Sequence, residues 1–261
     1  MIVTFISGAT GGIGKAFSIE CAKNGENLFL TGRSEEKLKK LKEELSKITS
    51  SNIDYFACDL TSENARRVMV TYIESKNYSI GRIINVAGVD IQKPFVDYTR
   101  EKLLFQLRVN VEATIDLTYL LLSRKASELE IITIASMSGV SPMPYFAVYS
   151  ATKALLINLF TSLHYELKEQ GVKVTTVLPG GVPTREDIIK DIENQGIWGK
   201  LSSKSPEFVA KKSLKAVKKN KIKYIPGFFN KFLNFLMKLA PKKIVLIFIA
   251  KRWKKISKDA F

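Results

Sequence analysis

The sequence predicts an α/β fold, a doubly wound parallel sheet of about seven strands with a helical, basic C-terminal extension. Short apolar, β-branched runs such as Ile2–Ile6 and Ile131–Ala135 alternate with segments whose apolar residues recur at helical spacing. Glycines follow the first of these runs and precede a helical segment, which is typical of a nucleotide-binding turn. A chain of 261 residues is long enough for one such domain with a large core.

The first strand is predicted at Ile2–Ile6, and the first helix runs over 15–24 and ends at Gly25. Between them, residues 7–14 read Ser-Gly-Ala-Thr-Gly-Gly-Ile-Gly. Glycines here let the backbone approach a pyrophosphate, and the helix N-terminus attracts its charge. A glycine loop alone is often only a structural turn, but its place between strand and helix favours a dinucleotide site.

A second strand, Asn27–Thr31, leads into Gly32, Arg33 and Ser34. An acidic residue at this point would bind the ribose 2′-hydroxyl of NAD, and none is present. The Arg33 guanidinium suits a 2′-phosphate instead, so the sequence favours NADP over NAD. The alternative is a solvated arginine beside a helix that Ser34 caps.

Two further strands are predicted at Ile53–Ala57 and Arg82–Val86. Thr61 is expected to cap a helix that ends near residue 76, and one long helix is expected over about 100–123. Asn110 lies inside this long helix, where a polar side chain competes with the backbone. It is either a surface residue or one retained for function.

The strand Ile131–Ala135 ends at Ser136, and two prolines delay the next helix until about Val148. Tyr149 and Lys153 then lie four residues apart, on one face of that helix. A lysine ammonium one turn away lowers the pKa of a tyrosine hydroxyl from about 10. The serine hydroxyl can donate to a substrate carbonyl. Tyr-x-x-x-Lys also occurs in ordinary amphipathic helices, so the assignment depends on the other motifs.

Taken together, these motifs resemble the short-chain dehydrogenase/reductase family. Gly8, Gly12 and Gly14 have its glycine spacing, and the interval of thirteen between Ser136 and Tyr149 matches its pattern. Motifs in the family's order extend over roughly residues 2–184. The resemblance implies a Rossmann fold and an NAD(P)-dependent oxidoreductase that acts on CH–OH groups.

The resemblance also implies roles for individual residues. Tyr149 would give the proton, Lys153 would lower its pKa and bind the nicotinamide ribose, and Ser136 would polarise the carbonyl. Asn110 would support the proton path. The residues expected to bind the cofactor are Ser7, Gly8, Thr10, Gly12, Ile13, Gly14, Arg33, Ser34, Asp59, Leu60, Asn85, Ala87, Gly88, Tyr149, Lys153, Pro179, Gly180, Val182 and Thr184.

After a sixth strand at Val172–Leu178, residues 185–205 are the expected lid over substrate. Ser205 and Pro206 start another helix, and a short last strand is expected at Lys223–Pro226. We therefore divide the chain into a Rossmann catalytic domain, 1–227, and an amphipathic basic helical extension of it, 228–261.

The extension concentrates both charge and aromatic residues. Residues 200–261 hold 18 of the 41 basic residues but 2 of the 25 acidic ones. Phe and Leu recur beside lysines over 228–239, and Pro241 restarts a helix that leads into Lys251-Arg-Trp-Lys-Lys255. Such a helix suits contact with an anionic membrane over 228–258. Docking on its own domain or on a dimer mate is equally consistent. The dense apolar face argues against a nucleic acid partner.

No cluster of Cys and His suggests a metal, and no apolar run is long enough to span a bilayer. We expect a cytoplasmic protein, peripheral at the membrane if the extension binds there, and a homodimer or homotetramer as is usual in the family.

The predicted function is NADPH-dependent interconversion of a carbonyl and a secondary alcohol on a hydrophobic substrate, such as a steroid or 3-oxoacyl compound. Two alternatives remain: a regulatory protein that binds NADPH without turnover, and a membrane-associated scaffold whose basic extension does the work.

Overall fold

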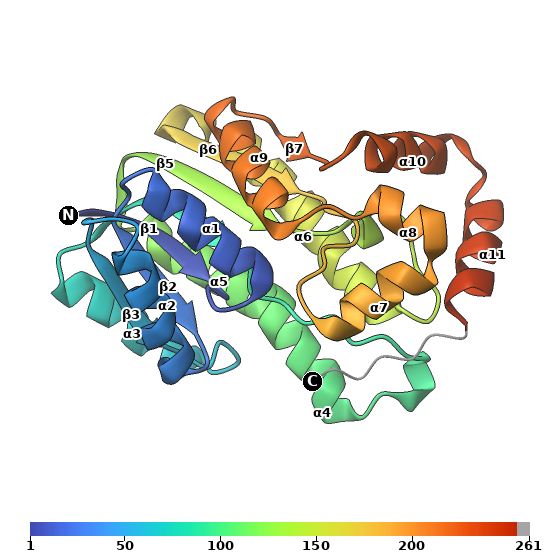
Figure 1. Ribbon diagram of the computed structural model, residues 1–261, viewed down its shortest axis with the longest axis horizontal. Helices are drawn as coiled ribbons and strands as arrows, with labels where there is room; N and C mark the ends of the chain where they lie inside the picture. The colour runs from blue at the N-terminus through green and yellow to red at the C-terminus, as the bar shows by residue number, and fades with distance from the viewer. Residues whose placement is uncertain (255–261) are drawn as a thin grey trace.

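The computed structural model describes residues 1–254 of the chain. Its centre is a seven-stranded parallel sheet with the strand order β3-β2-β1-β4-β5-β6-β7 (Figure 1). The strands are β1 Ile2–Ser7, β2 Leu28–Gly32, β3 Ile53–Ala57, β4 Ser79–Asn85, β5 Lys125–Ile134, β6 Val172–Val177 and β7 Lys223–Tyr224. The predicted doubly wound parallel fold is confirmed.

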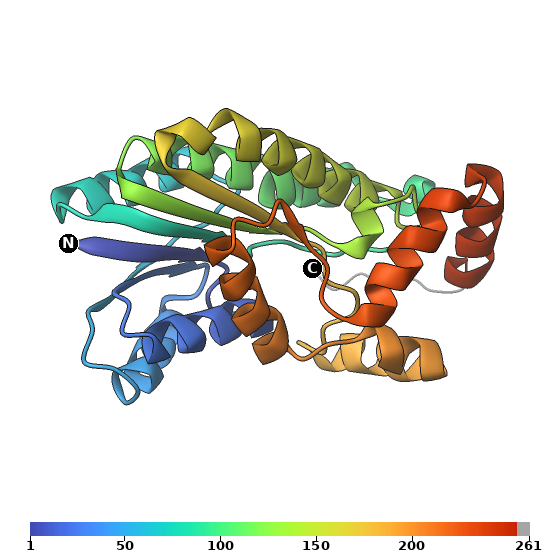
Figure 2. The ribbon, with the colours of Figure 1, turned by 90° about the horizontal axis from the view of Figure 1, so that it is seen from above.

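Helices cover both faces of the sheet (Figure 2). One face carries α1 Gly12–Lys23, α2 Glu35–Ser46 and α9 Pro206–Lys218, and the other carries α3 Glu63–Ser75, α5 Ala113–Leu122 and α6 Ala147–Glu166. All five residues of β2 are buried, as expected for a strand covered on both sides. Phe17 belongs to the core on the α1 side, and Phe5 and Phe160 belong to the core on the α6 side.

Four further helices gather beyond the carboxyl ends of the central strands, on the right of Figures 1 and 2. They are α7 Glu186–Asn194, α8 Gly196–Ser202, α10 Phe228–Leu239 and α11 Lys242–Trp253. The predicted lid over 185–205 thus consists of α7 and α8. The C-terminal extension forms two helices as far as residue 253, and its Lys255 lies outside the described residues.

The long helix predicted over about 100–123 is present, but its middle turn is not α-helical. The structure has α4 Arg100–Leu107, a π-helical turn at Arg108–Glu112, and then α5. Inside the wide turn, the Asn110 side chain bonds the backbone of Val89, and the Thr114 hydroxyl donates to the Asn110 carbonyl at 3.0 Å. Single π turns of this kind are frequent at functional sites.

The prediction that Thr61 caps the next helix is wrong, because Ser62 caps α3 by accepting from the Ala65 amide at 3.2 Å. The Thr61 hydroxyl donates to the Asp59 carboxylate at 2.8 Å instead, and this competing acceptor removes it from the helix end.

Several predicted element ends shift by a few residues. β5 starts at Lys125 rather than at Ile131, because its first residue already pairs with Ile80 of β4. Helix α1 starts at Gly12, so the last glycines of the loop lie in its first turn. The last strand ends at Tyr224 rather than at Pro226.

Candidate active site

A cavity of about 660 Å³ opens at the carboxyl edge of the sheet. Ser136 after β5 and Tyr149 and Lys153 of α6 lie on one wall, and residues of α7, α10 and α11 form the other. Open parallel sheets bind ligands at this edge, where the strand order reverses between β1 and β4. The structure therefore brings the three predicted catalytic side chains to one cavity.

Tyr149 lies in the first turn of α6, and its ring stacks on Phe146 with the centroids 4.4 Å apart. Burial raises the pKa of the Tyr149 hydroxyl, and the Asp90 carboxylate raises it further, against smaller opposing effects of a Ser136 hydrogen bond and the Arg185 charge. The hydroxyl is therefore protonated at neutral pH and can give a proton.

Lys153 is 4% exposed, and its ammonium donates to the Ile134 carbonyl at 2.9 Å. It lies 5.6 Å from the centroid of the Tyr149 ring. Burial lowers the pKa of Lys153 to about 8, since a buried ammonium loses its hydration. Burial is thus the largest influence on the pKa of both groups, and the role of Lys153 in lowering the pKa of Tyr149 stays a prediction.

Ser136 is buried at the end of β5, where its Oγ accepts from the Ser138 amide at 3.0 Å. The Ser136 side chain also shares a hydrogen bond with Tyr149. Two hydroxyls that face one cavity from adjacent elements can hold a single carbonyl oxygen between them.

Asn110 is fully buried, and its amide donates to the Val89 carbonyl at 2.9 Å and to the Thr152 hydroxyl at 3.1 Å. A Cβ built on Gly88 would lie 3.3 Å from both Asn110 Oδ1 and Lys153 Nζ. Asn110 and Lys153 therefore meet at Gly88, and the reading of Asn110 as a surface residue is wrong.

An ion pair that the sequence analysis missed lies beside Tyr149. Arg185 donates to Asp90 at 2.8 Å and to Asp187 at 3.1 Å. Asp90 and Arg185 both line the cavity and both act on the pKa of Tyr149. Their positions in the sequence could have drawn attention to both residues, because Asp90 closely follows the Asn85–Gly88 motif and Arg185 directly follows Thr184.

The glycine loop fits a dinucleotide. Gly8 has φ +65°, and a Cβ there would lie 2.8 Å from the Ala87 amide nitrogen. A Cβ on Gly14 would lie 2.1 Å from the Gly8 carbonyl oxygen, so only glycine allows this turn. The N-cap of α1 is Gly11, which has no side chain to bond the first amides of the helix. Those amides suit the phosphates of NAD(P).

Within the same motif, Ile13 lines the cavity, whereas the Ser7 hydroxyl accepts from the amides of Val86 and Ala87 at 3.2 and 3.3 Å. Ser7 therefore ties β1 to the end of β4. The Thr10 side chain lies against Gly32 at the end of β2.

Arg33 is exposed at the end of β2, where its guanidinium lies 6.0 Å from the centroid of the Phe105 ring. Ser34 caps α2 by accepting from the Lys37 amide at 3.3 Å, as its sequence position indicated. Among residues 1–254, no carboxylate pairs with the Arg33 guanidinium, so it is able to receive a phosphate.

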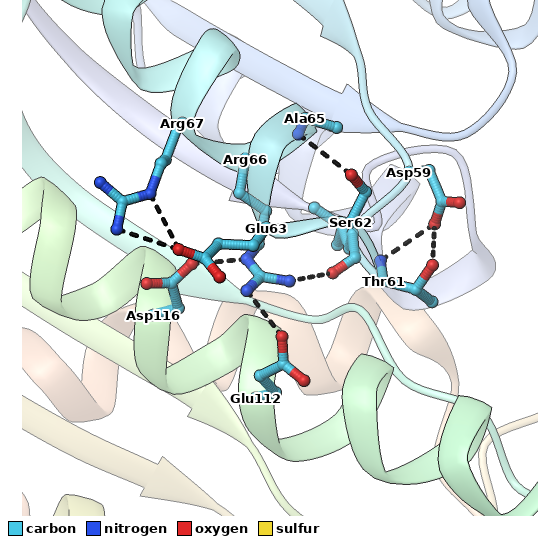
Figure 3. Close-up of polar contacts among 10 residues, drawn as sticks. Asp59, Thr61, Ser62, Glu63, Ala65, Arg66, Arg67, Glu112 and Asp116 are labelled. Carbon is cyan, nitrogen blue, oxygen red and sulfur yellow. Dashed lines mark hydrogen bonds and ion pairs between the residues drawn. The ribbon is translucent and has the colours of Figure 1, made fainter.

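Asp59 and Leu60 follow β3 and are held by the cluster in Figure 3. Asp59 accepts from the amide and hydroxyl of Thr61, and the buried Arg66 donates to the Leu60 carbonyl at 2.7 Å. Arg66 also pairs with two acidic residues, Glu112 in the π turn and Asp116 in α5, at 2.8 and 2.5 Å. This network fixes the expected adenine-binding segment to the element that carries Asn110.

The predicted residues after β4 divide into two groups. Gly88 lines the cavity, but the Asn85 side chain is 3% exposed and donates to the hydroxyls of Thr118 and Thr133. The Asn85 side chain thus joins β4 to α5 and β5 and does not line the cavity. The Ala87 backbone packs against Gly8.

The segment after β6 brings Pro179, Gly180, Val182 and Thr184 to the cavity wall. A Cβ on Gly12 would lie 2.6 Å from Thr184 Cγ2, so this segment lies against the start of α1. The two parts of the predicted cofactor site are thus in contact.

The C-terminal helices complete the cavity. Phe229, Leu233 and Met237 of α10 line it together with Val245 and Ile249 of α11. Trp253 extends the aromatic wall, because its ring lies 6.3 Å from that of Phe146. The sequence left open whether the extension docks on its own domain or contacts a membrane. The face of α10 and α11 that lines the cavity docks on its own domain.

Gln92 is a further cavity residue that the sequence analysis missed. It is 3% exposed, and within residues 1–254 its Nε2 has no hydrogen-bond partner. Nothing in the sequence distinguishes it from other polar residues of the loop after β4.

Comparison with known proteins agrees with the fold. Residues 2–192 match the family described as short chain dehydrogenase.

The curated relatives include the very-long-chain 3-oxoacyl-CoA reductase of Bos taurus, 33% identical over 221 residues that cover 81% of this chain and 67% of that protein. The 17-beta-hydroxysteroid dehydrogenase type 3 of Rattus norvegicus is 31% identical over 186 residues, which cover 69% of this chain and 59% of that protein.

Among solved structures, one from a study of 7beta-hydroxysteroid dehydrogenase stereoselectivity superposes with a TM-score of 0.85. It is 23% identical and the match covers 95% of this chain and 96% of the other. This similarity shows a common fold.

Proposed function

The chain belongs to the short-chain dehydrogenase family of NAD(P)-dependent oxidoreductases acting on CH–OH groups, and we propose that it reduces a hydrophobic ketone reversibly with NADPH. The observation that carries this proposal is the meeting of Ser136, Tyr149 and Lys153 in one cavity beside the glycine loop. Apolar side chains from α10 and α11 close that cavity on the side away from the sheet.

When bound, the nicotinamide supplies the hydride that the protein itself lacks. Tyr149 gives its proton to the developing alkoxide, and its raised pKa keeps that proton in place at neutral pH. Ser136 donates a hydrogen bond to the same oxygen. Lys153 stabilises the phenolate left on Tyr149, and Asn110 fixes the loop at Val89 beside Lys153.

A preference for NADPH is supported by Arg33, which directly follows β2, and by the lack of an acidic residue at the end of that strand, where NAD-binding proteins hold the ribose 2′-hydroxyl. A guanidinium can donate two hydrogen bonds to such a phosphate. The glycine loop and the start of α1 receive the pyrophosphate, and Asp59 and Leu60 border the adenine.

The hydrophobic substrate class is supported by the cavity and by two relatives. The wall contributed by α10 and α11 is largely apolar. The relatives are named as a 3-oxoacyl-CoA reductase and a 17-beta-hydroxysteroid dehydrogenase, whose names denote lipid-like substrates. Burial of such a chain stabilises the complex by roughly 25 cal/mol per Å² of apolar area.

The outer face of the extension suits an anionic membrane. Phe228, Phe232, Phe235 and Leu239 follow one face of α10 and are all exposed, with Lys231 and Lys238 on the same helix. Among residues 1–254, no helix is long and apolar enough to cross a bilayer. Peripheral contact over 228–258 would put the cavity next to lipid; its residues 255–258 lie outside the described part.

We also propose a homodimer or homotetramer. Tyr119 of α5 and Tyr165 of α6 are 74% and 65% exposed, and Leu155 of α6 is 41% exposed. Exposed apolar side chains on neighbouring helices are typical of an interface. Light scattering on the purified chain measures the mass directly.

The substitution Tyr149→Phe tests the function. It removes the hydroxyl but keeps the ring stacked on Phe146, so the fold and NADPH binding should be retained. With a panel of apolar ketones, NADPH oxidation should fall by about 10³-fold or more, as expected for loss of a general acid.

The matched control is Tyr165→Phe, an exposed tyrosine at the other end of α6, which should retain full turnover. Undiminished oxidation in Tyr149→Phe would refute the catalytic assignment. Binding of NADPH without oxidation of it by any ketone would favour the regulatory alternative.

A further inference from the structure

The loop that follows β4 is held in place by buried side chains. Asn110 bonds both the amide and the carbonyl of Val89, at 2.7 and 2.9 Å, and Gln106 donates to the same carbonyl at 3.3 Å. The Tyr98 hydroxyl donates to the Ile91 carbonyl at 2.8 Å. Gln92 therefore sits on a rigid segment, next to residues whose polar groups are satisfied.

Gln92 itself is the exception in this loop. Its side chain is almost completely buried and lies on the wall of the cavity that holds Ser136 and Tyr149, and no residue in the described part of the chain offers its Nε2 an acceptor. An unpaired buried donor destabilises a folded protein, and native proteins rarely keep one without a use. A bound molecule that carries an acceptor oxygen would satisfy it.

Gln92 therefore differs from the other polar residues of the cavity. Asp90 pairs with Arg185, Asn230 donates to Ser202 and Pro226, and Arg252 donates to Gln195. Ser136 and Tyr149 are assigned to the reacting carbonyl. The Gln92 amide is left for a different oxygen of the substrate.

We propose that Gln92 Nε2 donates a hydrogen bond to a second oxygen of the substrate, so that the enzyme selects oxo esters, oxo thioesters or similar compounds over plain ketones. This inference rests on the proposed function, because it assumes that Ser136 and Tyr149 receive the reacting carbonyl. A plain ketone leaves Gln92 unpaired, and a site built to bond a polar group discriminates against an analogue that lacks it.

The test uses ethyl oxo-octanoates with the ketone at carbon 2, 3 or 4, each compared with the plain ketone of the same chain length. For the unmodified enzyme with NADPH, kcat/KM should favour at least one ester over its ketone by roughly tenfold, mainly through KM. In Gln92→Met, which keeps the side-chain length without the amide, this ratio should fall to near one. In Gln92→Glu the ester should be disfavoured further, because two oxygen acceptors would then face each other.

Thermal unfolding separates this role from a structural one. Gln92→Met removes an unsatisfied group, so the Tm of the cofactor-free protein should stay equal or rise. The matched control is Ser213→Ala in α9, which removes another buried, unpaired polar atom remote from the cavity wall. The control should leave the ester-to-ketone ratio unchanged.

Three results would overturn the proposal: a ratio unchanged in Gln92→Met, a loss confined to the KM for NADPH, or a Tm clearly lowered by that substitution. If no compound is reduced at all, the proposed function fails instead. The inference is then decided by calorimetric binding of the same esters and ketones in the presence of NADP⁺, which cannot reduce them. Equal affinities of ester and ketone would reject it.

Discussion

The two walls of the cavity are built differently. On the sheet side, Lys153, Asn110 and Ser136 are buried and bonded to backbone atoms of neighbouring elements. On the other side, α10 and α11 offer apolar side chains, and many residues of these helices remain partly exposed. The residues proposed for the chemistry thus lie on the wall that is fixed by hydrogen bonds to the backbone, while the opposite wall is mainly apolar.

The largest expected effect is on stability, and it compares a glycine packed on the sheet side with a glycine at the start of α8. Gly14→Ala places a Cβ 2.1 Å from the Gly8 carbonyl oxygen and should lower the free energy of unfolding by about 3 kcal/mol or more. Gly196→Ala lies at the first residue of α8, where the added Cβ meets no described residue within 4 Å, and should cost about 1 kcal/mol for its positive φ. Urea unfolding of both variants measures the difference, and equal losses would contradict it.

Charge burial on the sheet side gives a pH effect. Lys153 has a pKa of about 8 in the folded protein, below its unfolded value, so the folded state releases this proton first as pH rises. The stability of the protein relative to Lys153→Met should therefore rise by about 3 kcal/mol between pH 8 and 10.5.

Unfolding by urea at pH 7 and pH 10.5 tests this, with Lys37→Met on the exposed surface of α2 as the control. Below pH 8 the buried charge destabilises the fold, so Lys153→Met should there be no less stable than the unmodified protein. A difference that is independent of pH would show that Lys153 is not desolvated.

The nucleotide preference should respond to Arg33. Arg33→Leu removes the group proposed for the 2′-phosphate, and the KM for NADPH should rise about 30-fold while that for NADH changes little. Arg67→Leu, an exposed arginine paired with Glu63 on α3, is the control for loss of charge. A parallel rise for both nucleotides would place Arg33 outside the phosphate site.

The smallest expected effect concerns the outer face of the C-terminal extension. Replacing Phe228, Phe232 and Phe235 by serine should weaken sedimentation with anionic vesicles about tenfold, because each ring can insert at the interface. These residues do not line the cavity, so turnover of a water-soluble ketone reports on the fold. Replacing the exposed Phe95 and Val96 by serine is the matched control, and equal vesicle binding in all proteins would remove the membrane proposal.

Local patterns were enough to predict the parallel sheet and most helix positions. Two of these patterns can be recognised within a short stretch of sequence. They are the spacing of Gly8, Gly12 and Gly14 and the interval from Ser136 to Tyr149. The glycine loop and the Ser136–Tyr149 segment lie close together in the structure, because parallel strands end at the same edge of a sheet. The π turn at Arg108–Glu112 could not be predicted in this way, since the hydrogen-bond partner of Asn110 is Val89, which is distant in sequence.

By itself, therefore, the sequence determined the fold class, the cofactor loop and the Ser136–Tyr149–Lys153 set, because each depends on spacing along the chain. Only the tertiary structure decided that burial sets the pKa of Lys153, that Asp90 pairs with Arg185 beside Tyr149, and that α10 and α11 close the cavity. Desolvation and pairing depend on which distant segments exclude water from a group, and no local pattern carries that information.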